Sequence, residues 1–299
     1  MTKKLLLIVN PNAGRMKAGT VLLDLISEFS RGGYDVTVFP TAKKSDAEER
    51  VKNHGGNYDL IVSCGGDGTL SETVNGLAWI SETRGKRVPF GFVPAGTAND
   101  FANTVGMPNG MKEAARAIIG GRNRSLDFGR FNDRYFIYVA AFGLFTSVSY
   151  TVPQDMKKTL GQFAYLLEGL KQAIDVPSRR LTVEYNGKVI RDDFVLGAVT
   201  NSTSVAGMFK LNKARVKLND GKFEVTLVRD PKNPVRLSKL IMDLSAQRFD
   251  PRYVLFEKTE EVKVSSGGEP VAWCLDGEDG GSYGEAAIKN LHKKGVIRI

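Results

Sequence analysis

The residues best suited to chemistry form a glycine-rich segment, Gly65-Gly66-Asp67-Gly68-Thr69-Leu70. It follows an apolar run at residues 60–64 and precedes residues that are compatible with a helix. Glycines let backbone N–H groups approach an anion, and the positive end of a helix dipole adds to the attraction, so this pattern predicts a phosphate-binding loop. The Asp67 carboxylate would repel that anion unless it orients a metal ion, a water molecule or a substrate hydroxyl. A tight strand-to-helix turn without a ligand is the alternative.

Three further polar segments follow other predicted strands. Asn10-Pro11-Asn12-Ala13-Gly14 follows the first strand, Thr41 lies just beyond the second, and Pro94-Ala95-Gly96-Thr97-Ala98-Asn99-Asp100 follows the fourth. Ligands collect at the carboxyl ends of the strands in open α/β sheets, so these segments would share one rim with the glycine loop. Each segment alone is an ordinary turn composition, and only their common position favours a binding site.

Two acidic turns occur in the second half of the chain. Asp276-Gly277-Glu278-Asp279-Gly280-Gly281 is either a solvated hairpin turn or a cluster of functional carboxylates. Lys217-Leu218-Asn219-Asp220-Gly221-Lys222 is either a type I′ hairpin turn or a site where an Asp and neighbouring carbonyls hold a hard cation. The local sequence decides neither case.

The elements that would position these segments differ between the two halves of the chain. About the first 120 residues alternate strand-like and amphipathic runs, which predicts a parallel sheet with crossover helices. The predicted helices span residues 21–30 and 45–54, and Ser45 with Glu48 and Thr69 with Glu72 have the spacing of capping boxes. The predicted strands span residues 5–10, 34–39, 59–64 and 90–93.

From about residue 124 the pattern changes to alternating runs closed by turn dipeptides, which predicts antiparallel sheet. Hairpins are expected at residues 181–196 around Asn186-Gly187 and at residues 216–228 around Asp220-Gly221, with one helical insert at residues 156–174. We therefore expect a nucleotide-binding domain at residues 1–125, completed by residues 285–299, and a second domain at residues 126–284.

Composition narrows the class of protein and its partners. The 299 residues are 42% apolar and 25% charged, as in a globular chain that can bury a core. The 42 Lys and Arg residues against 33 Asp and Glu residues give a net charge of +9, which favours an anionic partner. Two cysteines cannot build a disulfide framework, and neither an export signal nor a membrane-spanning run is visible. We expect a cytoplasmic protein, and no basic helix or aromatic and basic strand motif favours nucleic acid.

The segments at residues 10–14, 65–75, 94–100 and 276–278 resemble, in order and spacing, those of the soluble bacterial diacylglycerol kinase-like lipid kinases over nearly the whole chain. The glycine motif alone is similar to that of NAD kinases and, more distantly, of phosphofructokinases, whereas the late acidic motif separates the lipid branch. The resemblance implies an N-terminal α/β nucleotide-binding domain of the NAD kinase and phosphofructokinase type. It further implies a C-terminal all-β sandwich that contributes the lipid side, ATP as phosphoryl donor and Mg²⁺ in the cleft between the domains.

The resemblance also implies roles for individual residues. Glu278 would be the catalytic proton acceptor, with Asp67 as its competitor, and the structural magnesium position maps onto the Asp220 carboxylate with the backbone carbonyls of Lys217 and Lys222. Asp127 would join Asp67 and Asp100 in a carboxylate and water network that reaches towards the metal. Ala13 replaces the commoner serine of the first loop, which removes one hydroxyl contact. The nucleotide would contact Asn10, Pro11, Asn12, Ala13, Gly14, Thr41, Gly66, Asp67, Gly68, Thr69, Leu70, Ser71, Glu72 and Thr97.

The implied activity is ATP-dependent phosphorylation of the primary hydroxyl of diacylglycerol, or a related lipid, to give phosphatidic acid. We expect reversible peripheral contact of the second domain with the inner face of the membrane, and the resemblance makes a homodimer plausible. The cations expected to meet the membrane are Lys157, Lys158, Lys171, Arg179 and Arg180. The alternatives are an NAD kinase, which would need a second nucleotide site, and a non-catalytic nucleotide- or lipid-binding protein of the same fold.

Overall fold

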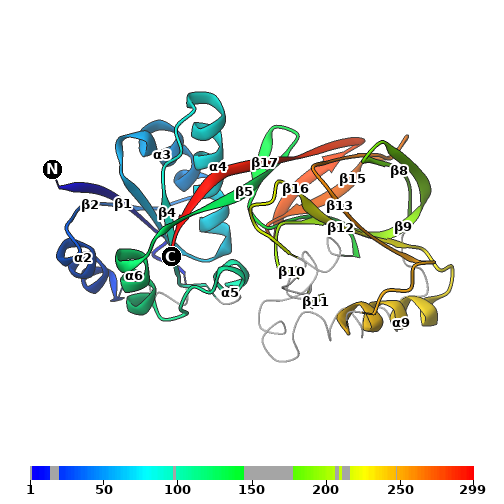
Figure 1. Cartoon of the computed structure of the whole chain (residues 1–299), viewed down its shortest axis with the longest axis horizontal. Helices are drawn as coiled ribbons and strands as arrows, with labels where there is room; N and C mark the ends of the chain where they lie inside the picture. The colour runs from blue at the N-terminus through cyan, green and yellow to red at the C-terminus, as the bar shows by residue number, and fades with distance from the viewer. Residues whose placement is uncertain are drawn as a thin grey trace. The chain divides into compact units, whose positions relative to one another are not determined.

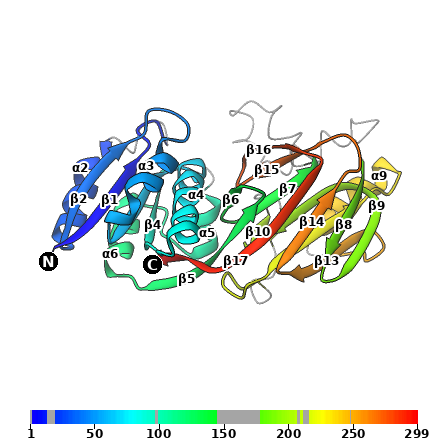
Figure 2. The same ribbon diagram turned by 90° about the horizontal axis from the view of Figure 1, so that it is seen from above.

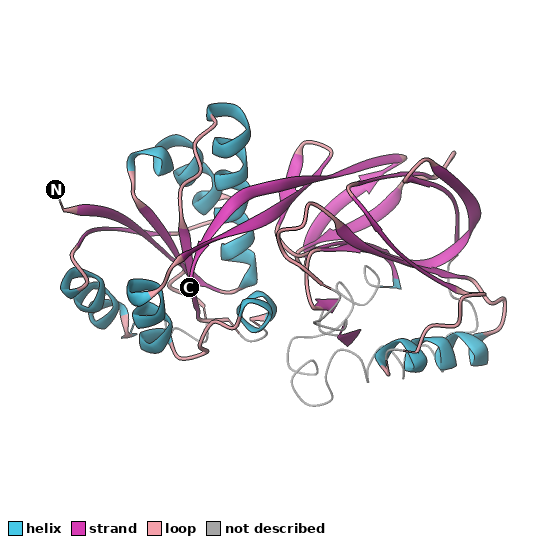
Figure 3. Ribbon diagram, in the orientation of Figure 1, coloured by secondary structure: helices cyan, strands magenta, loops and turns pink. Residues whose placement is uncertain are grey.

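The computed structural model describes residues 2–13, 20–96, 99–144, 178–205, 209–210, 216–246 and 248–299. The chain divides into two compact units: unit 1 contains Met1–Phe128, Arg134–Ile137 and Leu291–Ile299, and unit 2 contains Gly129–Asp133 and Tyr138–Asn290. Helices and strands alternate in unit 1, whereas unit 2 consists mainly of strands (Figure 3). Gly14, Thr97 and the helical insert predicted at residues 156–174 lie outside the described residues.

Unit 1 contains a parallel sheet in the order β4-β3-β1-β2. The Leu5–Val9 part of β1 is buried, because crossover helices cover both faces of a parallel sheet and leave no polar side to the strand. The predicted α/β arrangement of parallel strands is confirmed. The strands of this sheet are β1 (Lys3–Val9), β2 (Tyr34–Pro40), β3 (Leu60–Gly65) and β4 (Phe90–Pro94).

The helices of unit 1 cover the two faces of this sheet (Figure 1). α2 packs against α6 on one face and α3 packs against α4 on the other. α2 buries Leu25 and Phe29 and α3 buries Ala47 and Val51, in both cases four residues apart on one helix face. The elements are α2 (Leu22–Arg31), α3 (Asp46–His54), the 3₁₀ helix η1 (Gly55–Asn57), α4 (Asp67–Arg84), α5 (Asp100–Val105) and α6 (Met111–Gly120).

Helix α4 is the central helix of unit 1, and most of its residues from Thr69 to Ser81 are buried. It approaches α3 closely at Gly76, where an added Cβ would lie 2.6 Å from the Val51 Cβ. It ends at Gly85, whose φ of 65° is the left-handed conformation typical of helix C-termini. Among the described residues, no helix combines the length and the apolar character needed to cross a bilayer.

The segment Leu291–Ile299 completes unit 1. Ile297 pairs in parallel with Phe90 at the edge of β4, and Ile299 exchanges backbone hydrogen bonds of 2.9 and 3.2 Å with Arg122. The Arg298 guanidinium donates to the carbonyls of Ile118 and Ile119 at the end of α6. This segment belongs to β17 (Glu285–Arg298), which, like β5 (Asn123–Phe131), contains residues of both units.

Unit 2 contains an antiparallel sheet in the order β16-β15-β7-β9-β8-β14-β17 (Figure 2). β12 pairs with both β9 and β13. Trp273, Phe131 and Phe142 pack in its core, with ring centroids 4.9 to 5.0 Å from that of the tryptophan. The remaining strands of the chain are β6 (Arg134–Phe136), β7 (Val139–Gly143), β8 (Arg179–Tyr185), β9 (Lys188–Thr200), β10 (Ser204–Val205), β11 (Phe209–Lys210), β12 (Phe223–Arg229), β13 (Val254–Thr259), β14 (Glu261–Ser265), β15 (Val271–Leu275) and β16 (Glu278–Tyr283).

One predicted hairpin is confirmed and the other is wrong. β8 and β9 are joined by Asn186-Gly187, and both residues have the positive φ that a type I′ turn requires. Residues 216–219 form no strand, and β12 pairs instead with β9 and β13, which lie far from it in sequence. A turn dipeptide followed by an alternating run predicts the strand but does not identify its partner.

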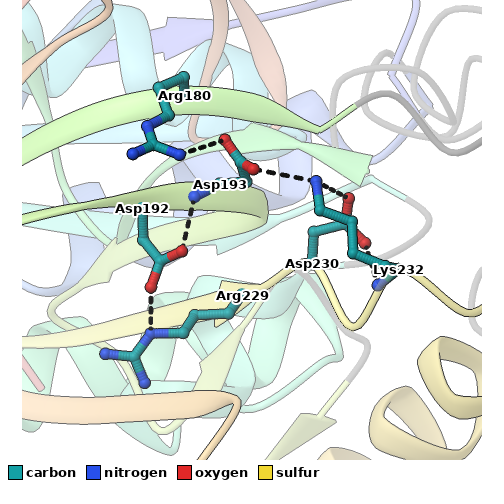
Figure 4. A network of polar contacts seen from close by, with 6 residues as sticks. All are labelled: Arg180, Asp192, Asp193, Arg229, Asp230 and Lys232. Carbon is teal, nitrogen blue, oxygen red and sulfur yellow. Dashed lines mark hydrogen bonds and ion pairs between the residues drawn. The ribbon is translucent and has the colours of Figure 1, made fainter.

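A polar network links β8, β9 and the loop before helix α9 (Pro234–Ser245) (Figure 4). Asp193 lies 3.6 Å from Arg180 and 2.9 Å from Lys232, which also pairs with Asp230 at 3.1 Å. Asp192 pairs with Arg229 at 2.8 Å. These are ion pairs of partly exposed side chains, and they fix the loop that leads into α9.

Candidate nucleotide-binding rim

The carboxyl ends of the four parallel strands bring the predicted phosphate-binding segments together. The Asn10 N–H donates to the Cys64 carbonyl at 2.9 Å, and the Ala95 N–H donates to the Gly65 carbonyl at 2.8 Å. The Thr41 N–H donates to the Val9 carbonyl at 2.8 Å. These bonds continue the sheet ladder beyond the strands, so the loops after β1, β2, β3 and β4 start side by side.

The glycine loop lies at the N-terminus of α4, and its glycines permit close contacts. An added Cβ on Gly65 would lie 2.6 Å from the Thr69 hydroxyl, and one on Gly96 would lie 2.7 Å from the Gly66 Cα. A side chain on Gly96 would push the β4–α5 loop away from the β3–α4 loop, and one on Gly65 would clash with the first turn of α4. The first-turn N–H groups of α4 have no acceptor within the helix, so the rim presents amides and a positive dipole end.

The first loop is organised by the Asn10 side chain. Its Oδ1 accepts the Asn12 N–H at 3.0 Å, and its Nδ2 donates to the Thr69 hydroxyl at 3.3 Å. The Ala13 N–H also donates to the Asn10 carbonyl at 3.1 Å. Asn10 therefore couples residues 10–13 to the first turn of α4, whereas the side chain of Leu70 is fully buried in the core.

Asp67 and Asp100 form a pair of carboxylates at this rim. Asp67 Oδ2 accepts the Asp100 N–H at 3.3 Å, whereas Asp67 Oδ1 is buried without a hydrogen-bond partner among the described residues. Burial, and then the Asp100 charge, raise the pKa of Asp67, although backbone amides at the start of α5 lower it. Burial also raises the pKa of Asp100. An uncompensated buried carboxylate oxygen is costly, so this position favours a cation or a hydrogen-bond donor.

Both predicted capping boxes are wrong, and at the start of α3 a glutamate of another helix supplies the acceptor. The helix α4 begins at Asp67, which places Thr69 inside its first turn. The Glu72 carboxylate accepts the N–H groups of Ser45 at 2.8 Å and Ala47 at 3.2 Å, at the start of α3. Glu48 pairs instead with Lys52 one turn later. Ser45 adopts a left-handed φ of 71° and makes no side-chain cap.

The late acidic motif forms a hairpin turn with two differently placed carboxylates. Asp276 and Gly277, with φ of 50° and 84°, connect β15 to β16. Asp276 is only 2% exposed, and its Oδ1 accepts the N–H groups of Tyr138 at 3.0 Å and Val139 at 3.1 Å. Glu278 is exposed at the start of β16. The turn is therefore a hairpin, as one reading predicted, but its first carboxylate is a buried structural residue and not a solvated one.

The predicted magnesium ligands lie on the turn before β12, where Asp220 has two other partners. Its Oδ1 accepts the Lys222 N–H at 3.1 Å, and its Oδ2 lies 3.3 Å from the Lys258 ammonium, which also lies 2.9 Å from Glu224. No cluster of three His, Cys, Asp or Glu side chains suited to a metal occurs among the described residues. A carboxylate and carbonyls suit a hard cation, but at this turn an internal ammonium already neutralises the carboxylate.

Sequence reasoning missed Glu224 and Lys258. Glu224 is fully buried, and burial raises its pKa to about 7 although Lys258 opposes the shift. Its position opposite Lys258 in the β12–β13 pair explains the contact. The sequence signal that could have identified Glu224 is a charged residue inside the apolar run of β12. The sequence does not reveal which strand pairs with β12, so it gives no signal for Lys258.

Two other residues singled out in the sequence, Asp127 and Cys64, are buried and help to hold the fold together. The fully buried Asp127 accepts the Lys293 N–H at 2.6 Å and faces the His292 imidazole at 3.3 Å, which ties it to β17. Cys64 is fully buried at the end of β3, and burial raises its thiol pKa to about 12, which agrees with its predicted packing role.

Comparison with known proteins identifies the family. Residues 4–131 match the diacylglycerol kinase catalytic domain. Diacylglycerol kinase from Bacillus subtilis (strain 168) is 34% identical over 93% of this chain and 91% of its own length, and diacylglycerol kinase from Staphylococcus aureus (strain MRSA252) is 34% identical over 98% and 91%.

Solved structures agree on the fold. A crystal structure of a diacylglycerol kinase from Bacillus anthracis str. Sterne aligns with a TM-score of 0.75 at 23% identity, covering 99% of this chain and 96% of that one. A second structure from the same organism, described as a candidate diacylglycerol kinase, aligns with a TM-score of 0.81 at 25% identity over 99% and 94%. The matched segments include the glycine loop and its rim, and the chain belongs to the diacylglycerol kinase family.

Proposed function

We propose that this chain transfers the γ-phosphoryl group of ATP to the primary hydroxyl of diacylglycerol, or of a related lipid, and so produces phosphatidic acid. Membership of the diacylglycerol kinase family supports the reaction class. The observation that carries the proposal is the buried, unpartnered Asp67 Oδ1 beside a glycine loop at a helix N-terminus. Such a site offers amides for phosphate oxygens and a carboxylate for an associated cation or hydroxyl.

Unit 1 would bind the nucleotide. The first-turn amides of α4 and the loop held by Asn10 would contact phosphate oxygens, and Thr41 would border the same rim. Phosphoryl transfer requires alignment and charge stabilisation more than covalent chemistry, so a rim whose loops are joined by hydrogen bonds is suited to it. The nucleotide contacts proposed for Gly14 and Thr97 concern residues outside the described ranges.

Mg²⁺ fits the chemistry of the rim better than that of the Asp220 turn. Asp67 and Asp100 supply carboxylate oxygens, one of them without a partner, and a hard divalent cation prefers oxygen ligands. Bound with ATP, the ion would neutralise charge on the phosphates. At the proposed position formed by Asp220 with the carbonyls of Lys217 and Lys222, a cation would have to displace Lys258 from Asp220. No step of the reaction is assigned to that turn.

Glu278 is the proposed proton acceptor for the lipid hydroxyl. Its carboxylate is exposed at the start of β16, and a carboxylate within hydrogen-bond reach of a hydroxyl can act as its general base. Asp67 is the alternative acceptor, because a raised pKa brings a carboxylate closer to the value that suits a general base at neutral pH. Asp127 would support Asp67 and Asp100 through water, as the family resemblance implies.

The remaining parts of the proposal concern architecture and location. Unit 2 would be a β-sandwich that binds the lipid, while unit 1 would share the NAD kinase and phosphofructokinase type of fold. The protein would be cytoplasmic, would contact the inner face of the membrane reversibly and would form a homodimer. Arg179 and Arg180, two of the cations proposed to meet the membrane, are exposed at the start of β8.

The test compares Glu278→Gln with a matched control, Glu285→Gln, another exposed glutamate of unit 2. We expect Glu278→Gln to lower the rate of phosphatidic acid formation by about 10²- to 10⁴-fold while ATP affinity, measured by calorimetry, is unchanged. The control should retain both. Unchanged turnover in Glu278→Gln would remove this residue from the mechanism and leave Asp67 as the base.

The same assay separates the alternatives. With ATP and either dispersed diacylglycerol or NAD as acceptor, we expect phosphorylation of the lipid alone. Phosphorylation of NAD alone would identify an NAD kinase. ATP binding without turnover of either acceptor would favour a non-catalytic protein of the same fold.

A further inference from the structure

The segment that follows β2, residues 41–47, is held by hydrogen bonds along almost all of its backbone. Thr41 donates to Val9 in the sheet, as described above. The Asp46 carboxylate accepts the N–H groups of Ala42 at 2.7 Å and Lys43 at 2.9 Å. These bonds fix the first half of the segment from within, while its second half depends on a residue of another helix.

That residue is Glu72, on the second turn of the helix that starts at the glycine loop. Its two carboxylate oxygens accept one backbone N–H group each, Oε1 from Ser45 and Oε2 from Ala47. Hydrogen bonds from backbone amides to a carboxylate are charge-assisted, and they join α4 directly to the start of α3. We call these two hydrogen bonds of Glu72 the clamp. The clamp links the β2–α3 segment, which begins at Thr41, to the helix whose N-terminus forms the proposed phosphate-binding loop.

The conformation at Ser45 shows that the clamp opposes a local preference. Ser45 has a φ of 71°, and the left-handed region is unfavourable for a non-glycine residue because its Cβ approaches the following carbonyl oxygen. Such a conformation persists only where surrounding contacts determine it. The hydrogen bond from the Ser45 N–H to Glu72 is one such contact, so its loss should let the segment relax.

Glu72 is badly placed to contact a nucleotide itself. Both of its oxygens are engaged by amides, and a carboxylate would repel phosphate oxygens. Burial raises its pKa, but the two amides favour its ionised form. Its sequence position beside the glycine loop is therefore explained by a mechanical link to the β2–α3 segment.

We propose that Glu72 is a positioning residue for the nucleotide, which holds the β2–α3 segment and Thr41 in register with the glycine loop. The proposal rests on the assignment of this rim to ATP. It differs from direct contact with the ligand, because it predicts that Glu72 acts on affinity through the order of residues 41–47. It also differs from a purely structural role, because the effect should appear in nucleotide binding and not in the chemical step.

The experiment uses Glu72→Ala, Glu72→Gln and the control Glu48→Gln, which removes a carboxylate of α3 that pairs with Lys52 and holds no backbone amide of the segment. ATP with Mg²⁺ is titrated by calorimetry without lipid, and hydrogen exchange is followed at Ser45 and Ala47. We expect Glu72→Ala to weaken ATP binding at least about tenfold and to accelerate exchange at both amides. Glu72→Gln, which keeps one acceptor, should lie between Glu72→Ala and wild type, and the control should match wild type.

The kinetic arm separates positioning from catalysis. With diacylglycerol as acceptor, KM for ATP should rise in Glu72→Ala while kcat at saturating ATP stays within about threefold of wild type. A variant with faster exchange at both amides but wild-type ATP affinity would overturn the proposal, as would a fall in kcat at unchanged KM. If Glu72→Ala does not fold, the Glu72→Gln comparison decides. If wild type binds ATP but phosphorylates no lipid, the proposed activity fails while the binding arm still tests Glu72.

Discussion

The carboxylates at the glycine loop of unit 1 and those of the β9 network of unit 2 have the same chemistry and opposite environments. Asp67 and Asp100 are desolvated, and burial raises the pKa of both, with the Asp100 charge adding to the shift at Asp67. Asp193, hydrogen-bonded to Lys232, has a lowered pKa. Burial alone would raise the pKa of Asp230, but hydrogen bonds from Lys232 and Ser178 lower it.

This difference separates carboxylates that hold the fold from carboxylates that are available for chemistry. In the network of unit 2, each carboxylate pairs with a Lys or Arg side chain of the same unit. These carboxylates therefore do not need a cation from a ligand. Among the described residues, the rim in unit 1 keeps the Asp67 Oδ1 carboxylate oxygen buried without a partner, which costs stability unless a ligand completes it. Sites that are incomplete in isolation are the ones at which function concentrates.

The largest effect should follow removal of the charge at the rim. Asp67→Asn replaces the carboxylate, whose Oδ1 has no partner among the described residues, by an amide of the same shape, and we expect the rate of phosphatidic acid formation at saturating ATP to fall at least about 100-fold. Asp193→Asn is the matched control in unit 2 and should leave the rate unchanged. If Asp67→Asn kept a rate within threefold of wild type, the proposed distinction between the two regions would have no catalytic meaning.

A third carboxylate, Glu224, extends the comparison, because it is buried like Asp67 but paired like Asp193. Its pKa is raised from 4.5 to about 7, so between these values the folded protein binds more protons than the unfolded chain. The contribution of Glu224 to stability is therefore fully present below pH 4.5 and is lost as pH rises through about 7. At 1.36 kcal/mol for each pKa unit, the loss is about 3 kcal/mol.

Urea unfolding at pH 5 and pH 8 measures this loss. Glu224→Gln cannot ionise, so its free energy of unfolding should fall between the two pH values by about 3 kcal/mol less than that of wild type. Other titrating groups contribute to both proteins and cancel in the difference. An identical pH dependence in the two proteins would show that burial does not control this carboxylate.

The smallest effect should come from the network in unit 2. Asp193→Asn removes partly exposed ion pairs with Arg180 and Lys232, which are worth about 0–1 kcal/mol. A double-mutant cycle with Lys232→Met, measured by urea unfolding, should give a coupling energy in that range, smaller in high salt because salt screens exposed charges. A coupling energy of 2 kcal/mol or more would mean that the two regions differ less than their exposure suggests.

Features set by nearby residues could be predicted from the sequence. The apolar runs at β1 and β3 and the glycines after β3 predict a parallel sheet with loops at the carboxyl ends of its strands, because the positions of strands and loops follow from local patterns. The turn at Asn186-Gly187 is equally local.

The errors and omissions concern partners that lie far apart in sequence. Glu72 has capping-box spacing to Thr69, yet it bonds to Ser45 and Ala47, 27 and 25 positions away. Asp276 resembles a solvated turn residue, but its carboxylate accepts the N–H groups of Tyr138 and Val139, which lie 138 and 137 positions away in the sequence. Neither contact leaves a periodic signal, because each is created by the packing of separate elements.

The position of residues 291–299 in the sequence has a consequence for biosynthesis. Residues 291–299 complete unit 1, yet nearly all of unit 2 is translated before them. A ribosome-bound chain would therefore display β4 with an open edge until β17 emerges, and an open strand edge is a template for aggregation. Interruption of translation anywhere in unit 2 would leave unit 1 without its closing strand, so unit 1 is finished only after most of unit 2 has been made.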